Sequence, residues 1–177
     1  DGRTVYVTAD DGTVLAGTRG RVAEVKNKRV RDLALRHGKP FIALMEAGAA
    51  RVQETYGATA AGLGYRFGDH FRMSGRVPQV GAALGPCFGG PSFTAAQSDF
   101  GPIVAGTGFL GMSGPPVVKV GIGLDATTEE IGGGELSAKE TGQASYLAET
   151  EVECMASIRA FLSYLPSSSS EAPPRVA

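Results

Sequence analysis

An α/β fold is predicted for these 177 residues by three features of the sequence. Glycine is abundant, with 26 residues, whereas tryptophan is absent and aromatic residues make up 7% of the chain. This composition favours tight turns over a helical bundle. The continuous apolar run at residues 41–45 is typical of a strand that helices cover on both faces of a parallel sheet. A strand at 4–8, a helical pattern after residue 20 and the run at 41–45 follow the βαβ order.

A β-hairpin is predicted to open the chain. Residues 4–8 are β-branched and aromatic, residues 10–12 offer turn chemistry, and residues 13–16 form a second apolar stretch. The loop 17–20 then leads into a helix, and Gly38 marks the end of that helix.

The remaining elements continue the alternation of strands and helices. We expect a helix at 58–73, a strand at 79–84, a short helix at 92–97, strands at 100–104 and 108–112, a helical turn from 114–116, and a short helix from 128 that ends at 132–134. Thr150 and Glu153 fit a capping box that begins a final helix. Its expected apolar face consists of Val152, Met155, Ile158, Phe161, Leu162 and Leu165.

One domain, residues 1–166, is predicted, because 42% apolar residues suffice for one core. Residues 167–177 are rich in serine and proline, so we expect a linker that does not pack. The net charge of -1 gives no reason to expect nucleic acid or membrane as a partner. Two distant cysteines and two histidines predict no metal site, and reduced thiols without a membrane-spanning apolar run predict a cytoplasmic protein.

Six short motifs occur along the chain in a fixed order. They are the loop 17–20 followed by Lys26, Glu-Ala-Gly-Ala-Ala-Arg-Val-Gln-Glu at 46–54, Val-Pro-Gln at 77–79 with Gly-Pro-Cys-Phe-Gly-Gly at 85–90, Gly-Pro-Pro-Val-Val-Lys at 114–119, Glu-Glu-Ile-Gly-Gly at 129–133, and Phe-Leu-Ser-Tyr-Leu-Pro at 161–166. In this order they resemble the amino-terminal domain of carboxyltransferase β subunits of biotin-dependent acyl-CoA carboxylases, of the propionyl-CoA and acetyl-CoA carboxylase type. The resemblance implies a crotonase (ClpP-like) ββα superhelix, here as a single domain that lacks its upstream part.

The resemblance also implies an enzymatic activity. Such a subunit transfers a carboxyl group from carboxybiotin, carried by a partner domain, to the α-carbon of an acyl-CoA. The implied partners are a biotin carboxylase and biotin carboxyl carrier subunit, a carboxyl-terminal carboxyltransferase domain that would follow the linker, and further copies in a homo-oligomer. Because family active sites form between domains of two subunits, this piece alone is expected to be catalytically incomplete.

The catalytic candidates are backbone amides, because forming an enolate places negative charge on the thioester oxygen. By resemblance, Gly48 and Ala49 would supply N–H donors, with alanine tolerated at 49 only if its φ is negative. The turn that ends in Gly89 and Gly90 would form a second such site at the start of a helix. Without the family resemblance, packing alone would be the favoured explanation of the first turn, whereas a functional role and a close helix–sheet contact explain the second turn equally well.

Further residues are candidates for binding the substrate. By resemblance these are Gly17, Thr18, Arg19, Gly20, Lys26, Ala47, Ala50, Arg51, Cys87 and Phe88. Basic residues at 19–31 could hold the phosphates of CoA, with Lys26 matching the family lysine and a solvated basic face favoured for the others. Arg51 and Glu54 are expected to pair and hold their loop, and Cys87 to be a small buried residue rather than a nucleophile.

Two alternatives to a carboxyltransferase stay open, and three departures from the family motifs motivate one of them. Serine is replaced by Ala47, a glycine by Ala49, and a small residue by Phe88. These changes motivate a non-catalytic acyl-CoA-binding domain as one alternative. The other is a biotin-independent acyl-CoA decarboxylase of the crotonase type, which would use the same oxyanion geometry.

Overall fold

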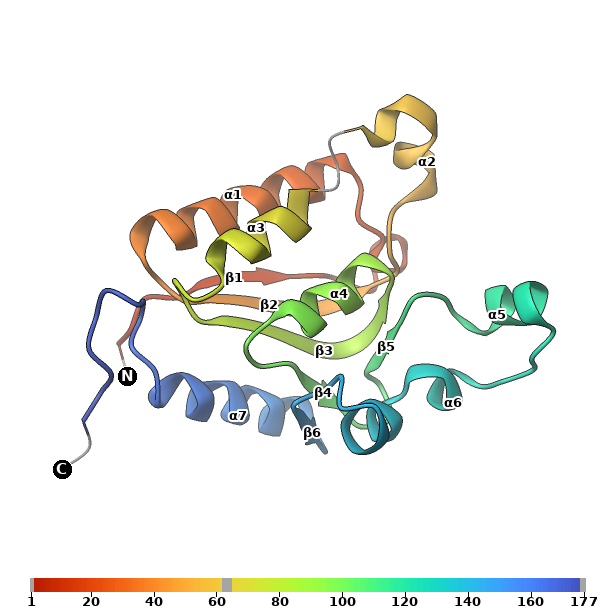
Figure 1. The fold of residues 1–177 in the computed structure, drawn as a ribbon. Coiled ribbons are helices and arrows are strands. Elements are labelled where there is room, and N and C mark those ends of the chain that lie inside the picture. The colour runs from red at the N-terminus through yellow and green to blue at the C-terminus, as the bar shows by residue number, and fades with distance from the viewer. Residues whose placement is uncertain (1, 62–64, 176–177) are drawn as a thin grey trace.

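A computed structural model describes residues 2–61 and 65–175 (Figure 1). Within them six parallel strands form one sheet in the order β1-β2-β3-β4-β6, and β5 pairs with β3 outside this path. The strands are β1 (Tyr6–Ala9), β2 (Phe41–Ala47), β3 (Gln79–Phe88), β4 (Pro102–Val104), β5 (Phe109–Gly111) and β6 (Tyr146–Ala148). The helices are α1 (Arg21–His37), α2 (Val52–Thr55), α3 (Tyr65–Met73), α4 (Gly90–Gln97), α5 (Pro115–Ile122), α6 (Thr128–Gly132) and α7 (Glu151–Ser163). The predicted α/β fold is confirmed.

The predicted opening hairpin is wrong. β1 pairs with β2 in parallel, with Tyr6 opposite Phe41, and the expected second strand is a 3₁₀ turn at Leu15–Gly17. The cause is local, because the Asp11 carboxylate accepts hydrogen bonds from the N–H and the hydroxyl of Thr13, at 2.9 and 2.6 Å. Such a turn ends β1 and directs the chain into α1, which returns it to β2.

Two apolar cores lie on opposite faces of the sheet, because successive strand residues point to opposite sides. On one face Phe41 and Met45 of β2 pack with Met73 of α3. On the other face Ile42 packs with Ile158 of α7. Figure 1 shows the resulting layers, with α1 and α3 on one side of the sheet and α7 on the other.

The later elements follow the sequence prediction with shifted ends. The helix expected at 58–73 is a 3₁₀ turn at Gly57–Ala60 followed by α3, and residues 62–64 of that prediction lie outside the described residues. β3 runs to Phe88, four residues further than expected, and α4 begins directly after Gly89. Three elements were not predicted, namely α2, β6 and a π-helical turn at Leu136–Glu140.

The final helix has the predicted N-cap, since the Thr150 hydroxyl accepts the N–H of Glu153 at 3.2 Å. The Glu153 carboxylate instead accepts from the N–H of Glu149 at 2.9 Å, so the capping box is only half formed. Val152 is 80% exposed and does not belong to the apolar face. After the helix, Ser167 and Ser168 are buried, so the start of the predicted linker packs on the domain, while residues 172–175 are exposed.

Candidate functional site

Two loops meet at the carboxyl end of β2, where parallel α/β sheets place ligands. The N–H of Gly48 donates to the carbonyl of Ala16 at 3.1 Å, and the N–H of Arg19 donates to the carbonyl of Ala49 at 2.8 Å. The N–H of Arg51 donates back to the carbonyl of Arg19 at 2.9 Å. The glycine loop at 17–20 and the motif at 46–54 therefore form one hydrogen-bonded unit. The sequence alone gave no reason to place these two segments together apart from the family resemblance.

Backbone strain is concentrated in this unit. Ala49 has φ +71°, and among the described residues the only other non-glycine residues with positive φ are Leu15 and Ala16, in the facing loop. The condition set for alanine at this position, a negative φ, is therefore not met. An L-residue in the left-handed region costs about 1–2 kcal/mol, and such strain persists where surrounding contacts fix the backbone, commonly at functional sites.

The second predicted turn lies beside the first. Gly89 has φ 63° and ψ -116°, a conformation that needs glycine, and its N–H donates to the carbonyl of Gly111 at 2.8 Å. A Cβ atom added to Gly89 would lie 3.7 Å from the Cβ of Ala49. The two turns are thus in van der Waals proximity, and α4 starts from this point with its N-terminus.

The four candidate amides differ in whether they are available to a ligand. Those of Gly48 and Gly89 already donate to backbone carbonyls, so we correct the expected donor set by removing them. Among the described residues, none accepts a hydrogen bond from the N–H of Ala49 or of Gly90. One amide in each turn is therefore left to a ligand.

Arg19 was expected to bind substrate, but its side chain is 5% exposed. Its guanidinium forms two hydrogen bonds with the Asp10 carboxylate, at 3.0 and 2.5 Å. A buried arginine whose charge is matched in this way cannot also reach a phosphate at the surface. Arg19 therefore contributes to the site through the hydrogen bonds of its backbone. The expectation that its side chain binds substrate is wrong.

Arg51 and Glu54 pair as predicted, at 2.7 Å. The other Arg51 amino group donates to the carbonyl of Thr18 at 2.8 Å, and Glu54 accepts from the N–H of Arg21 at 2.8 Å. These bonds to Arg51 and to Arg21 hold the pKa of the Glu54 carboxyl below its usual range. The pair thus ties the strained motif to the glycine loop and to the first turn of α1.

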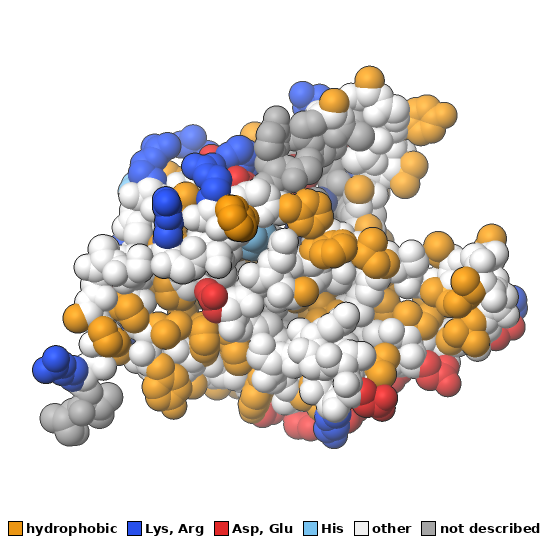
Figure 2. Space-filling view, viewed as in Figure 1, with side chains coloured by type: hydrophobic (Ala, Val, Ile, Leu, Met, Phe, Trp, Pro, Cys, Tyr) orange, Lys and Arg blue, Asp and Glu red, His pale blue; other side chains and the backbone are white. Residues whose placement is uncertain are grey.

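The basic residues of α1 fall into two groups. Arg31 is buried and pairs with Asp69 of α3 at 3.0 Å, and Lys28 pairs with Asp32 at 2.8 Å. Lys26 is exposed, five residues or about 8 Å along the helix from its first residue. Figure 2 shows Lys and Arg side chains gathered on the side where α1 and α3 lie. The prediction that these basic side chains form a solvated face is therefore wrong for Arg31, which is buried and paired with Asp69.

The remaining candidates line or support the same edge. Gly17 is buried, and an added Cβ would lie 2.0 Å from the carbonyl oxygen of Glu46, so only glycine allows this approach of the loop to β2. Cys87 is fully buried, and burial raises the pKa of its thiol to about 12, as expected of a structural residue. Phe88 packs on Phe109, with ring centroids 4.6 Å apart, and supports the second turn.

The described residues contain no group of three or more His, Cys, Asp or Glu side chains that could hold a metal ion. No described helix is long and apolar enough to cross a membrane.

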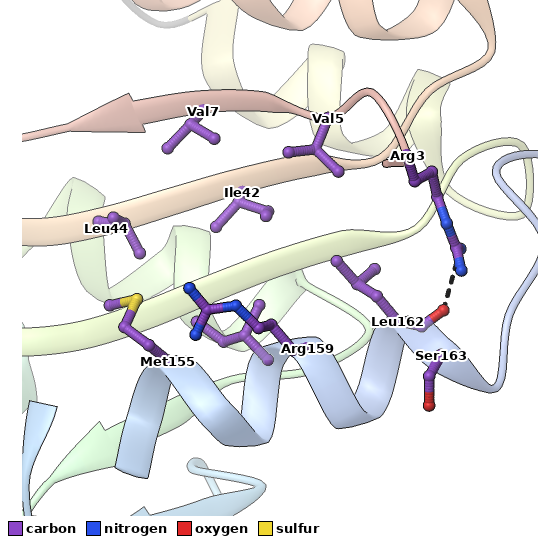
Figure 3. Close-up of a pocket in the computed structure, with 10 residues that line it drawn as sticks. Arg3, Val5, Val7, Ile42, Leu44, Met155, Arg159, Leu162 and Ser163 are labelled. Carbon is purple, nitrogen blue, oxygen red and sulfur yellow. Dashed lines mark hydrogen bonds between the residues drawn. The ribbon is translucent and has the colours of Figure 1, made fainter. Parts of the chain in front are cut away.

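A groove of about 450 Å³ lies between α7 and the β1–β2 face (Figure 3). Figure 3 shows Val5, Ile42 and Leu44 on the sheet side of the groove, and Met155 and Leu162 on the α7 side. None of the predicted site residues lines this groove.

The family follows from a comparison of the whole chain with known domains. The family model of the carboxyl transferase domain matches residues 1–177. This chain belongs to the carboxyl transferase domain family. The match confirms the resemblance that the ordered motifs predicted.

Relatives of this carboxyl transferase domain are longer proteins. The carboxyltransferase subunit of propionyl-CoA carboxylase from Haloferax mediterranei is 39% identical over 176 residues, which are 99% of this chain and 34% of that protein. The α subunit of methylmalonyl-CoA decarboxylase from Veillonella parvula is 38% identical, with the same shares covered. A solved structure of transcarboxylase 12S, with hydrolysed methylmalonyl-coenzyme A bound, has a TM-score of 0.89 and 32% identity over 96% of this chain and 34% of its own. The domain thus spans about a third of the length of its relatives, and the likeness confirms the crotonase-type fold.

Proposed function

We propose that this domain is the acyl-CoA-binding part of a biotin-dependent acyl-CoA carboxyltransferase, and that the N–H groups of Ala49 and Gly90 bind the thioester oxygen. The observation that carries this proposal is the placement of two neighbouring turns, each with one amide that no described residue uses. The family and the relatives named propionyl-CoA carboxylase support the same activity.

The chemistry requires electrons to move onto the thioester oxygen when the α-carbon becomes an enolate. A preorganised donor aimed at that oxygen contributes roughly 3 kcal/mol to lowering the barrier. The amide of Gly90 acts at the N-terminus of α4, where the helix dipole adds further attraction for negative charge. Carboxybiotin, held by a partner carrier domain, would supply the carboxyl group, and the biotin nitrogen that releases it would take up the α-proton, which leaves biotin and the carboxylated acyl-CoA as products.

The remaining parts of the proposal concern binding and assembly. Lys26 would hold a CoA phosphate, since it is exposed near the start of α1, whereas the Arg51–Glu54 pair would keep the strained loop in place. We also propose that residues 1–166 form one domain and that residues 167–177 lead towards the second carboxyltransferase domain. A biotin carboxyl carrier partner, a homo-oligomer and a cytoplasmic location are part of the same proposal.

Removing a single amide proton tests the catalytic role. Gly90 is the first residue of α4, a position where proline is tolerated because no helical hydrogen bond is lost. In the complete carboxylase with its biotinylated partner, Gly90→Pro should lower kcat for acyl-CoA carboxylation by about 10²–10³-fold. Glu151→Pro, at the first residue of α7, is the matched control and should retain activity.

Two results would overturn the proposal. One is unchanged kcat in a folded Gly90→Pro variant, which would remove this amide from catalysis. The other is the absence of carboxylation with acyl-CoA substrates of every length in the complete enzyme. Biotin-independent release of carbon dioxide from malonyl- or methylmalonyl-CoA would favour the decarboxylase alternative instead.

A further inference from the structure

A second cavity, of about 370 Å³, opens beside the turn at Gly89 and Gly90. It lies between α4, β5, α5, α6 and the π-helical turn, and we call it the α4–β5 pocket. Its apolar walls include Phe93 and Ala96 of α4, Leu110 of β5, and Met112, Ile131 and Leu136. Apart from Phe93, none of these residues was predicted to be part of the site, because they come from five separate segments.

The α4–β5 pocket is in contact with the candidate site. Gly111 and Met112 line it, and the carbonyl of Gly111 accepts the N–H of Gly89 at 2.8 Å. The carbonyl oxygen of Met112 lies 3.8 Å from the position that a Cβ of Gly89 would take. A thioester oxygen bound by Gly90 would therefore leave its acyl group at the mouth of this pocket.

The pocket is less polar than its lining residues indicate. The Ser92 hydroxyl donates to the carbonyl of Gly89 at 2.7 Å, that of Ser137 to Gly132 at 3.2 Å, and that of Thr141 to Ser137 at 3.4 Å. These hydroxyl protons are satisfied by backbone and are not aimed at a ligand. The described lining residues also include Ser113 and Gln143 but no Lys, Arg or His, so no cationic side chain there would pair with a charged acyl terminus.

We propose that the α4–β5 pocket binds the acyl chain and makes the site selective for neutral aliphatic acyl groups longer than propionyl. This inference rests on the proposed function, because it assumes that the thioester lies at Ala49 and Gly90. The volume of about 370 Å³ is more than two carbons beyond a carbonyl require, so the pocket leaves room for a longer acyl chain.

The test measures CoA thioester binding by calorimetry in the intact carboxyltransferase subunit that contains these residues. Each methylene that enters the pocket should tighten binding by up to about fourfold, so octanoyl-CoA should bind at least ~10-fold more tightly than acetyl-CoA. Ala96→Phe fills the pocket from an exposed helix position and should reduce that preference to within about twofold, with acetyl-CoA affinity unchanged. Ala160→Phe, at an exposed position of α7, is the matched control and should keep the preference.

The outcomes separate this inference from the proposed function. Equal affinities for acetyl- and octanoyl-CoA, or an octanoyl preference that Ala96→Phe leaves intact, would overturn the pocket assignment while leaving the function standing. An equal loss of affinity for both thioesters in Ala96→Phe would also overturn it, since the pocket would not discriminate length. Absence of binding by every CoA thioester would overturn the proposed function and this inference with it.

Discussion

Replacing Ala49 by glycine should stabilise the protein, although alanine-to-glycine changes normally destabilise. At φ +71° the Cβ of Ala49 costs about 1–2 kcal/mol, which glycine would not incur. The greater freedom of glycine in the unfolded chain offsets about 0.4–1 kcal/mol of that gain. The net effect is a rise of roughly 0.5–1 kcal/mol in the free energy of unfolding, or about 1–4 °C in Tm for a chain of this size.

The neighbouring residue provides the control. Ala50 is exposed and has no positive φ, so Ala50→Gly should lower the free energy of unfolding by about 0.4–1 kcal/mol. Urea unfolding of both variants measures the two effects, and their difference isolates the strain at Ala49. If Ala49→Gly lowers stability as much as Ala50→Gly does, the loop is not strained and the reasoning is refuted.

Three other changes test separate parts of the structure. Asp10→Asn leaves the buried Arg19 charge without its partner and should cost about 3 kcal/mol in urea unfolding; a loss below about 0.5 kcal/mol would contradict the buried pair. Burial raises the pKa of the Cys87 thiol to about 12, so iodoacetamide should label this cysteine only after unfolding, and rapid labelling of the folded protein would contradict its burial. Lys26→Ala should weaken CoA binding by about tenfold or less without changing Tm. Lys139→Ala, a surface control, should leave both the affinity and Tm unchanged. Equal affinities of the Lys26→Ala variant and the unchanged protein for CoA would show that Lys26 does not bind a phosphate.

Much of the fold follows from local patterns in the sequence. The apolar run of β2 and the Gly38 cap of α1 were readable because their signals lie within a few neighbouring residues. The opening hairpin failed because residues 4–16 have the composition of two strands, whereas Asp11 turns the chain by hydrogen bonds to Thr13. Composition alone does not distinguish a hairpin from the first half of a βαβ crossover.

The site was predictable only in part, for a related reason. The motifs located both turns, but which of their amides is available depends on the distant partners of Gly48 and Gly89, namely Ala16 and Gly111. The positive φ of Ala49 likewise arises from contacts with another loop, and the burial of Arg19 depends on Asp10. Residues far apart in sequence therefore decide the details that neighbouring residues cannot specify.

A crystal structure of the carboxyltransferase subunit with a bound acyl-CoA would show where the thioester lies. We expect its oxygen within about 2.7–3.1 Å of the backbone nitrogens of both Ala49 and Gly90. A thioester bound elsewhere, or an oxygen turned away from these two nitrogens, would contradict it.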